Sequence, residues 1–581
     1  MLGNLAKLIG GCVLGGALLA GVLAPVSLGL GVTAAEVGDS VAKITPTAIS
    51  GKLPTVTTVT DKDGNTIATL YDQYRFPVNS DKIAPAMKAA LIAIEDRRFY
   101  QEHGIDPKAI LRAAINNAKG GDEQGGSTIT QQLVKNYLIN VVDRDDPVAQ
   151  RKDRADTLAR KLHEARSAID IDQQLTKDEI LTDYLNIVEF TGKVYGVEAA
   201  ARAYFGTTAD KLTVAQSAML AGMVNNPTRY NPYKDPVSTK TRRNTVLDAM
   251  VTNQAIDQAT ADKAKAEELG LVPDGPNVPS STCMGGPDYA GYLCQYALSY
   301  LTSNGFTANQ LDNGGYTIKT TLDAGVSQAA KEAVQNNVPT TQPGVANAMV
   351  IIRPGNQSHD ILALLANRNL GTDLGKGQTT RNLPAEVDDQ FGAGSVFKIF
   401  TSAAALESGV ADLDTPLPNP PVQSWTLPHQ RTPYTVKNDG GGDPVSLADG
   451  LAFSPNVAFV NLEMEVGVPK VVEMASRLGL RNTMAANADG KTPDPNSKNP
   501  VISQPMSQYF QDKPSFTLGN SPVSPLELAN VSATIMSGGV YCPPNPILSV
   551  TDASGQNVEV KRAGCEQAIS GDVASRLSTG L

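Results

Sequence analysis

The hydrophobic pattern of the chain begins with a long apolar segment. Residues 8–32 (LIGGCVLGGALLAGVLAPVSLGLGV) are 25 positions without a charged side chain. A helix of that length crosses a hydrocarbon core of about 30 Å with some tilt. Because Lys7 precedes the segment, the positive-inside tendency leaves the short N-terminus in the cytoplasm and the rest of the chain outside. We predict a single-pass membrane anchor within residues 1–35; the alternative is a signal peptide cleaved near residues 33–35.

Alternating polar and apolar positions follow the apolar segment. Residues 57–78 alternate around Asp63-Gly64-Asn65, a turn sequence typical of a β-hairpin. The residues before this hairpin are rich in Thr and Pro. We therefore predict a connector and a β-hairpin over residues 36–80.

The pattern then changes to helical spacing, which continues from residue 84 to about residue 269. Three helix starts carry the capping-box sequence, in which Thr is followed three positions later by Gln or Glu: Thr128, Thr176 and Thr213. These patterns predict an all-α domain over residues 81–270.

The second half mixes several patterns. Residues 271–315 carry Pro, Gly, Ser and two Cys, and this composition predicts an interdomain linker. Residues 315–323 predict a strand followed by a helix, and residues 348–367 predict a hairpin that turns at Pro354-Gly355-Asn356. We predict an α/β (α+β) domain over residues 316–581.

Length and charge exclude some classes of protein. A chain of 581 residues has room for three or four folded units, or two large ones, so a single small binding module is excluded. Lys and Arg number 49 against 59 Asp and Glu, a net charge of −10. Because nucleic-acid binding needs clustered basic residues, we expect no nucleic-acid partner.

Cysteine usage fits an oxidising compartment. Cys12 lies in the apolar segment, and an even number of cysteines would remain outside: Cys283, Cys294, Cys542 and Cys565. Of the three possible connectivities we choose nearest neighbours, which pairs Cys283 with Cys294 and Cys542 with Cys565. Without a C-x-x-C pair, and with only 4 His in the chain, a zinc site is not expected.

The first cluster of candidate chemistry lies in the predicted helical domain. Glu95 and Asp96 close an apolar helix, and glycines precede a second helix, whose N-terminal N–H groups can hold an anion or a sugar oxygen. On that second helix Thr128, Gln132 and Lys135 fall at i, i+4 and i+7 and line one face. Singly, such residues are also typical of a solvated helix end or a polar face.

Arg160 and Glu164 lie at i and i+4 on a further predicted helix. Alone, such a pair is usually a surface ion pair worth about 0.3–0.5 kcal/mol. Together with Glu95, however, it gives the domain two carboxylates, one of which has cations beside it.

These motifs resemble a known family. Residues 57–250 resemble the peptidoglycan glycosyltransferase domain (glycosyltransferase family 51, lysozyme-like) of class A, bifunctional penicillin-binding proteins. The family's E-D-x-x-F-x-x-H-x-G pattern is matched except at histidine, where this chain has Glu102, with His103 one residue later. The other matching motifs are Gly126-Ser127-Thr128, Gln131 to Asn136, Arg160-Lys161 with Glu164, Tyr184-Leu185-Asn186, and Tyr195 to Ala200.

The resemblance implies polymerisation of lipid II into a growing glycan strand at the outer face of the bacterial cytoplasmic membrane. Glu95 would be the general base that takes the proton of the acceptor sugar's 4-hydroxyl. Lys135 and Arg160 would neutralise the departing diphosphate, and Glu164 would assist there; a divalent metal such as Mg²⁺ at the diphosphate stays open. The residues assigned to substrate positioning are Asp96, Thr128, Gln132 and Asn136.

The second cluster pairs a serine with a lysine. Ser395 and Lys398 lie at i and i+3 at the start of a predicted helix, where a neutral lysine amine can take the serine proton. Downstream, Ser454-Pro455-Asn456 matches the S-x-N motif of penicillin-recognising enzymes. Residues 315–581 resemble the transpeptidase domain of the same class.

That resemblance implies that a D-Ala-D-Ala stem peptide acylates Ser395, with Lys398 as base, and that β-lactams acylate the same serine. Ser454 would relay a proton, Asn456 would bind the substrate amide, and a second stem peptide would resolve the acyl-enzyme into a cross-link. The chain contains no Lys-Thr-Gly sequence; Ser578-Thr579-Gly580 has serine in place of the basic residue. We therefore expect a transpeptidase domain truncated before its third motif and compromised in activity.

The sequence thus predicts a membrane-anchored synthase with a glycosyltransferase half and an incomplete transpeptidase half. Two alternatives stay open. In one, the lysozyme-like half hydrolyses glycan instead of making it. In the other, the chain is a scaffold or β-lactam-binding protein whose transpeptidase half is inactive.

Overall fold

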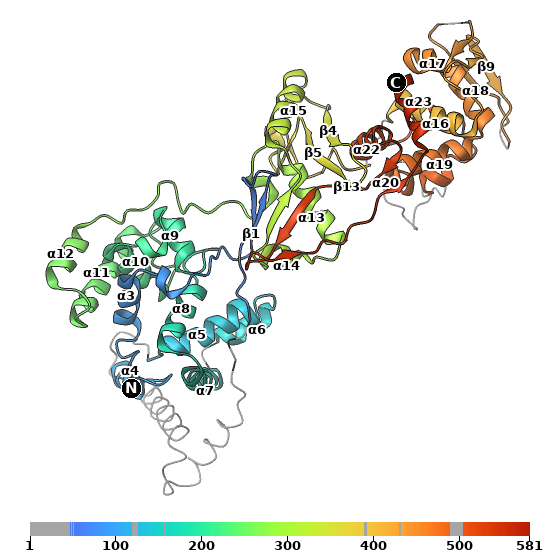
Figure 1. Ribbon diagram of the computed structural model, residues 1–581. Helices are drawn as coiled ribbons and strands as arrows, with labels where there is room; N and C mark the ends of the chain where they lie inside the picture. The colour runs from blue at the N-terminus through green and yellow to red at the C-terminus, as the bar shows by residue number, and fades with distance from the viewer. Residues whose placement is uncertain are drawn as a thin grey trace, which may run out of the picture. The chain divides into compact units, whose positions relative to one another are not determined.

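The computed structural model describes residues 47, 49, 51–118, 126–155, 157–387, 392–428, 431–440, 442–488 and 504–581. The chain divides into two compact units (Figure 1). The first comprises Met1–Val56 and Tyr71–Pro279, and the second comprises Thr57–Leu70 and Ser280–Leu581. The apolar segment 8–32 lies outside the described residues, and no helix within them is long and apolar enough to cross a membrane.

The described part of the first unit is built from helices around one apolar core, as the helical spacing predicts. Its elements are η1 (Ser80–Lys82), α3 (Pro85–Glu95), α4 (Pro107–Ala118), α5 (Ile129–Tyr137), the π-helical turn η2 (Leu138–Val142), α6 (Pro147–Arg154), α7 (Leu158–Gln174), α8 (Lys177–Ile187), α9 (Val197–Phe205), η3 (Ala209–Lys211), α10 (Val214–Val224), α11 (Pro236–Thr252) and α12 (Gln258–Ala266).

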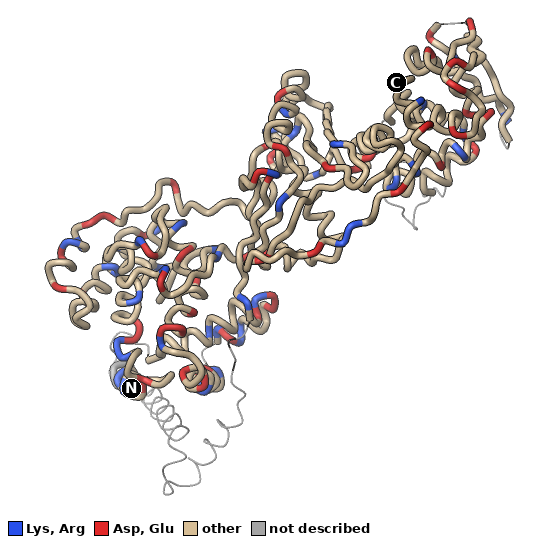
Figure 2. The backbone as a smooth tube through the Cα atoms, in the orientation of Figure 1, with Lys and Arg blue, Asp and Glu red and all other residues tan. Residues whose placement is uncertain are grey.

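Helix α10 is apolar on nearly every side and is buried, as expected for a helix without a polar face. It packs between α3 and α11, and α5 packs against α7 and α8. These contacts bring the end of α3 near residues of α5, α8 and α11. Charges of both signs lie close together along α6 and α7 (Figure 2).

The three predicted capping boxes are confirmed. Thr128, Thr176 and Thr213 each accept a hydrogen bond from the backbone N–H three positions on, and the Gln or Glu there bonds back to the threonine N–H. Each box satisfies two N–H groups that the first turn of a helix leaves without a partner.

The predicted hairpin forms, but it is not part of a connector before the helical domain. Strand β1 (Thr57–Thr60) pairs antiparallel with β2 (Thr66–Leu70) and parallel with β3 (Thr317–Thr320). These strands belong to a five-stranded sheet of the second unit, ordered β15-β14-β3-β1-β2, with β14 (Ile547–Thr551) and β15 (Asn557–Val558). The alternation of polar and apolar residues predicts the two strands, but it does not show which distant strand they pair with, here β3.

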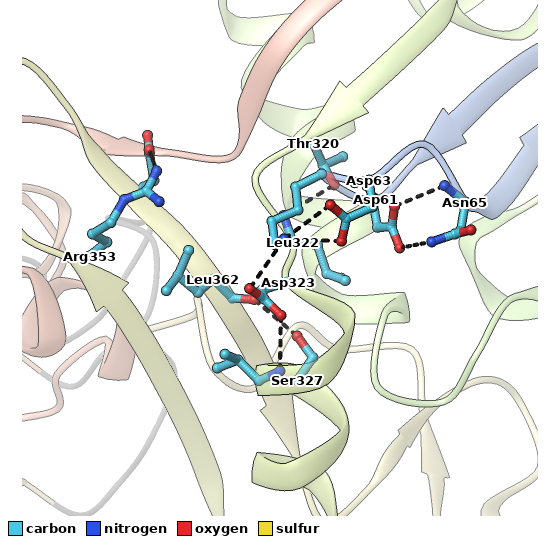
Figure 3. A network of polar contacts seen from close by, with 12 residues as sticks. Asp61, Asp63, Asn65, Thr320, Leu322, Asp323, Ser327, Arg353 and Leu362 are labelled. Atoms are coloured by element: carbon cyan, nitrogen blue, oxygen red, sulfur yellow. Dashed lines mark hydrogen bonds and ion pairs between the residues drawn. The ribbon is translucent and has the colours of Figure 1, made fainter.

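The hairpin loop is held by one carboxylate. Asp61 accepts hydrogen bonds from the backbone N–H groups of Asp63 and Asn65, both at 2.9 Å, and from the Asn65 side-chain amide at 2.8 Å (Figure 3). The Lys62 N–H donates to the carbonyl of Leu322 at 2.9 Å, just beyond β3. The loop is therefore held by its own hydrogen bonds and tied to the second unit.

The predicted linker over residues 271–315 is wrong for most of its length. Residues from Ser280 onward fold into the second unit and include the short helix η4 (Cys283–Gly285), α13 (Gly291–Ser303) and α14 (Ala308–Asn313). Apolar residues of α13 are buried in a core shared with the hairpin and with β5 (His359–Ala366). The Pro, Gly and Ser residues before Gly291 gave the whole segment the composition of a linker.

A second sheet, ordered β13-β5-β4, contains β13 (Pro544–Asn545), β5 and β4 (Ala348–Arg353). Strands β4 and β5 form the predicted antiparallel hairpin. Ala363 and Leu365 of β5 pack on α15 (Ala324–Asn337), whereas Leu364 and Ala366 pack in the core that contains α13. Strand β5 is therefore covered on both faces.

The rest of the second unit is mostly helical. Together with the two sheets, these helices give the second unit the mixed α and β content that the sequence predicts. The helices are η5 (Leu374–Lys376), η6 (Gly394–Phe397), α16 (Lys398–Ser408), α17 (Leu447–Phe453), α18 (Asn456–Val466), α19 (Val468–Leu478), α20 (Arg481–Ala485), α21 (Met506–Tyr509), η7 (Phe516–Leu518), α22 (Pro525–Met536) and α23 (Gly571–Gly580). The short strand pairs are β6 (Asn369–Leu370) with β7 (Gln378–Thr379), β8 (Pro416–Leu417) with β11 (Val445–Ser446), β9 (Val422–Trp425) with β10 (Tyr434–Lys437), and β12 (Val540–Tyr541) with β16 (Glu566–Gln567).

Both predicted disulfides are present. Cys283 pairs with Cys294, closing the segment between η4 and α13, and Cys542 pairs with Cys565 across 23 residues. Closing these loops limits the freedom of the unfolded chain and so stabilises the second unit.

Candidate active sites

Glu95 is the last residue of α3, and its carboxylate is largely buried, with 10% of the side chain exposed. The Gln132 amide nitrogen donates to Glu95 Oε2 at 3.0 Å, and Arg242 Nη2 of α11 lies 3.8 Å from Glu95 Oε1. Burial raises the pKa of Glu95 above its ordinary value, while the Gln132 hydrogen bond and the Arg242 charge oppose that rise. A carboxylate tuned in this way suits a general base.

Gln132 lies on α5, and a third residue fixes its side chain. The hydroxyl of Tyr184, on α8, donates to Gln132 Oε1 at 2.7 Å. Tyr184 is fully buried. The structure thus places Gln132 between Tyr184 and Glu95, in contact with the carboxylate itself.

A small pocket that opens to solvent lies beside Glu95. Asp96 lines it and is held against the start of α5, where the N–H of Ile129 donates to Asp96 Oδ2 at 3.2 Å. Burial raises the pKa of Asp96, and hydrogen bonds from backbone N–H groups oppose that rise. The residues that line the cavity are Glu95, Asp96, Arg97, Asp106, Ala109, Arg112, Gly126, Ser127 and Thr128.

Two of the predicted positioning residues bond to their own surroundings. The Thr128 hydroxyl caps α5 and donates to the carbonyl of Gly104 at 2.7 Å, and the residue is 1% exposed. The Asn136 amide donates to the carbonyl of Gln132 at 2.9 Å, within the same helix. Thr128 therefore shapes the cavity wall through the backbone that it holds.

A cationic cluster lies around Glu164 on α7. Arg160 donates to Glu164 Oε1, and Lys161 Nζ lies 3.1 Å from Glu164 Oε2. Lys161 also donates to Ser127, in the cavity wall, at 3.2 Å. Burial, and next the Arg160 charge, lower the pKa of Lys135. Three cations around one buried carboxylate leave a net positive charge, which suits a diphosphate.

The same cluster bears on metal binding. Glu164 is 2% exposed, and both of its oxygens are engaged by cations. Within the described ranges, no three His, Cys, Asp or Glu side chains come together in a way that could hold a metal ion.

Glu102, which replaces the histidine of the family pattern, lies in a buried ion-pair cluster. Lys177 Nζ lies 2.7 Å from Glu102 Oε1 and 2.6 Å from Asp172 Oδ1. Burial raises the pKa of Glu102 to about 7, against the effect of Lys177. The neighbouring His103 side chain is 93% exposed. Position 102 is a carboxylate and His103 is exposed, so neither position supplies a buried imidazole.

In the second unit, Lys398 is the first residue of α16 and is 2% exposed. Its amine bonds to the carbonyl of Ser454 at 2.5 Å, to Ser454 Oγ at 2.8 Å and to Asn456 Oδ1 at 3.0 Å. Burial lowers the pKa of Lys398 to about 8. The predicted S-x-x-K and S-x-N motifs are thus brought together at one amine that is readily made neutral.

Ser395 lies on η6, one turn before Lys398, and is exposed. The preceding N–H, of Gly394, donates to the carbonyl of Gly519 at 2.9 Å, and a Cβ on Gly519 would lie 2.0 Å from the Gly394 carbonyl oxygen. Ser454 adopts a left-handed conformation, with φ of 58°, and its three contacts with Lys398 and α17 hold it there. An exposed serine one turn before a buried amine whose pKa is lowered to about 8 is an arrangement that suits nucleophilic catalysis.

Ser578-Thr579-Gly580 does not lie beside this serine as a strand. It forms the last turn of α23, where the Ser578 hydroxyl donates to the carbonyl of Ala574 at 2.8 Å. Ser578-Thr579-Gly580 is therefore the C-terminal end of a helix.

Sequence reasoning missed Arg242 and Glu463. Glu463 lies on α18, is fully buried, and accepts a hydrogen bond from the N–H of Thr517 at 3.3 Å. Its Oε1 has no hydrogen-bond partner. A signal was present, because Glu463 occupies the buried phase of an apolar helix, between Phe459 and Val466. Arg242 carries no such local signal, since its contact with Glu95 is long-range.

Comparisons with known proteins identify two family domains in the chain. Residues 63–251 match the family Transglycosylase, and residues 356–580 match the family Penicillin binding protein transpeptidase domain. The chain therefore carries both domains of the class A, bifunctional penicillin-binding proteins and belongs to that family.

Similar relatives are penicillin-binding protein 2D of Bacillus subtilis (strain 168), at 29% identity over 87% of this chain, and penicillin-binding protein 1A of Mycobacterium tuberculosis (strain ATCC 25618 / H37Rv), at 29% over 86%. The alignments span 66% and 56% of those relatives, so the chain covers about half to two thirds of their length. The crystal structure of penicillin-binding protein 1A from Haemophilus influenzae shares the fold, with a TM-score of 0.53, 17% identity, and coverage of 91% of this chain and 80% of that one.

Proposed function

We propose that this protein polymerises lipid II into glycan strands and cross-links stem peptides through a serine acyl-enzyme, as a peptidoglycan synthase. The observation that carries the proposal is the contact set of Glu95, a largely buried carboxylate that lines a pocket in the transglycosylase domain. The wall of that pocket includes Ser127, which bonds to Lys161 of the cationic cluster. A base and a leaving-group site in one helical domain are what glycosyl transfer to an acceptor hydroxyl requires.

In the first reaction, Glu95 takes the proton from the 4-hydroxyl of the acceptor sugar. The hydroxyl oxygen forms a bond to the anomeric carbon of the donor, and the bond from that carbon to the diphosphate breaks with inversion. Lys135, Arg160 and Lys161 hold the negative charge that collects on the leaving diphosphate. Glu164 keeps Arg160 and Lys161 in place.

In the second reaction, Ser395 attacks the D-Ala-D-Ala carbonyl while neutral Lys398 takes the serine proton. Ser454 Oγ accepts a hydrogen bond from the Lys398 amine, and Ser454 relays the proton to the departing D-Ala. Asn456 binds the substrate amide; its bond to Lys398 supports this role. The amine of a second stem peptide then displaces Ser395 and forms the cross-link. β-Lactams acylate the same serine.

Two further parts of the proposal concern surroundings. We propose that residues 8–32 anchor the chain in the bacterial cytoplasmic membrane, with both domains outside, because lipid II is membrane-bound. We also propose that Mg²⁺, where it acts, enters with the diphosphate of the substrate, since Glu164 is already paired with two cations.

Incubating the purified chain with lipid II, with and without Mg²⁺, tests the first reaction. New long glycan strands support the synthase. No polymer, together with cleavage of preformed glycan, would favour the hydrolase instead.

Fluorescent penicillin tests the second site. Covalent labelling that is lost in Ser395→Ala supports the acyl-enzyme. A chain that neither polymerises lipid II nor turns over a stem-peptide substrate, although it binds penicillin, would be the scaffold or β-lactam-binding protein.

A further inference from the structure

A chain of three contacts surrounds Glu95, and it extends to residues that do not touch the cavity. The Tyr184 hydroxyl bonds to Gln132 Oε1 at 2.7 Å, Gln132 Nε2 bonds to Glu95 Oε2 at 3.0 Å, and Arg242 Nη2 faces the other Glu95 oxygen at 3.8 Å. We propose that Tyr184 and Arg242 are positioning residues that keep Glu95 ionised and aimed while it acts as the base. This role rests on the proposed glycosyl transfer at Glu95.

Tyr184 sets the direction of the Gln132 amide. An amide presents an acceptor on one side and a donor on the other. Because the Tyr184 hydroxyl donates to Oε1, the NH₂ group of Gln132 faces Glu95 and donates to its carboxylate. With the amide reversed, its oxygen would face Glu95, and only a protonated Glu95 could bond to it. The Tyr184 bond therefore favours the ionised form of Glu95.

Tyr184 is also well placed to hold this direction. It is fully buried, and burial raises the pKa of its hydroxyl well above the ordinary value, so the hydroxyl keeps its proton and stays a donor. Its neighbours on α8 are buried in the core of the first unit. The ring cannot swing to solvent without opening that core.

Arg242 acts on the opposite oxygen. At 3.8 Å its contact with Glu95 is an ion pair rather than a hydrogen bond, so it acts mainly through charge. Its Nε donates to the carbonyl of Gly222 on α10 at 3.3 Å, and the guanidinium lies 5.6 Å from the centre of the Tyr230 ring. A Cβ at Gly222 would lie 3.0 Å from Arg242 Cγ, so glycine allows the arginine this close approach.

The two other carboxylates that line the pocket have partners of their own. Asp96 bonds to the start of α5, and Asp106 pairs with Arg98. Removing Tyr184 or Arg242 leaves these groups in place. The charged residues that line the cavity beside Glu95 are Asp96, Arg97, Asp106 and Arg112.

A base must be ionised to accept a proton, so the rate of polymerisation rises with pH through the pKa of Glu95. Loss of the Arg242 charge, or of the Gln132 direction, removes an interaction that favours the ionised form. The acidic limb of the pH profile should then move to higher pH by about one unit, which is a tenfold lower rate on the limb. At higher pH the rate should recover.

The test is the pH profile of lipid II polymerisation by the full chain, for wild type, Tyr184→Phe, Arg242→Gln and Arg242→Lys. Two matched controls delete a tyrosine hydroxyl and an arginine guanidinium that do not contact Glu95. Tyr204→Phe deletes another buried hydroxyl, which bonds to Thr191, and Arg229→Gln deletes the other guanidinium beside the Tyr230 ring, at 5.5 Å. Thermal unfolding of each variant identifies the ones that are folded.

We expect the acidic limb to shift for Tyr184→Phe and Arg242→Gln, to return toward wild type in Arg242→Lys, and to stay in place for both controls. A limb that coincides with wild type in the folded Tyr184→Phe and Arg242→Gln variants overturns the role. If either variant does not fold, the other decides. A wild-type chain that makes no polymer would instead contradict the proposed function, and the two failures are thus distinct.

Discussion

Glu95 and Lys398 are both buried bases, and burial moves their pKa values in opposite directions. It raises the pKa of the carboxyl and lowers that of the amine to about 8, because in each case it penalises the charged form. The partners differ accordingly. Gln132 and Arg242 favour the charged carboxylate, whereas the amine is surrounded by oxygen atoms of Ser454 and Asn456 without a carboxylate among those contacts.

The two bases also occupy opposite ends of their helices. Glu95 is the last residue of α3, where the helix dipole is negative, and Lys398 is the first residue of α16, where it is positive. Each group therefore sits at the helix end that disfavours its charged form. Lys398 must be neutral to act as a base, so its place at the helix start favours its active form. Glu95 must be charged, and its contacts with Gln132 and Arg242 offset the unfavourable effect of the helix end.

A lowered pKa does not by itself mark a catalytic amine. Lys331, on α15, is 3% exposed, burial lowers its pKa to about 8, and it donates to the carbonyls of Ala366 and Arg368 and to Asn369 Oδ1. Its contacts match those of Lys398 in kind. Both lysines have a serine one turn before them, but Ser327, before Lys331, is fully buried and donates to the carbonyl of Leu362 at 3.0 Å. Ser395, before Lys398, is exposed, and this exposure separates the two lysines.

The largest expected effect tests that distinction. Lys398→Met should lower the rate at which penicillin acylates Ser395 by about 10²–10⁴-fold, because the base is lost. Lys331→Met should leave that rate unchanged in the folded protein and lower stability by about 1–3 kcal/mol, since buried carbonyls lose their donor. Stopped labelling reactions and denaturant unfolding measure both. Equal acylation rates in the two variants would remove Lys398 from the mechanism.

The pH dependence of acylation should follow Lys398. Because the amine acts as a base only when neutral, the acylation rate should rise about tenfold per pH unit below about pH 8 and level off above it. Labelling kinetics from about pH 6 to 9 give the profile. A flat profile over that range would mean that another group accepts the serine proton.

Glu463 should make the second unit less stable as pH rises. Burial raises its pKa well above the ordinary value, so the folded state keeps a proton that the unfolded state releases above about 4.5. The free energy of unfolding therefore falls with rising pH, by up to about 1.4 kcal/mol per pH unit, and Glu463→Gln should remove this fall. Denaturant unfolding at several pH values measures it, with the exposed Glu566→Gln as control. Parallel curves for wild type and Glu463→Gln would show that Glu463 is ionised in the folded state.

The smallest effect concerns a helix cap away from both sites. Thr176→Ala removes the side-chain acceptor of an exposed capping box on α8 and should cost about 1 kcal/mol of stability. Polymerisation per folded molecule should stay at the wild-type rate. A large loss of activity without a loss of stability would link this end of α8 to the site.

Features encoded in short stretches were predictable from the sequence. The capping boxes, the two hairpins and the i, i+3 placement of Ser395 and Lys398 depend on a few adjacent residues. The contact of Arg242 with Glu95 depends on the packing of α10 between α3 and α11, so no local pattern reports it. Composition misled at residues 280–315, where turn-forming residues precede the buried helix α13.

The separation of the two sites can be tested by measuring both activities in two variants. Samples of Glu95→Gln and Ser395→Ala are each given lipid II and fluorescent penicillin, and glycan strands and labelled protein are quantified together. The account predicts that Glu95→Gln loses polymerisation by about 10²–10⁴-fold and keeps its label, while Ser395→Ala loses its label and keeps polymerisation. If Glu95→Gln polymerises at the wild-type rate, or if either variant loses both activities, the account is contradicted.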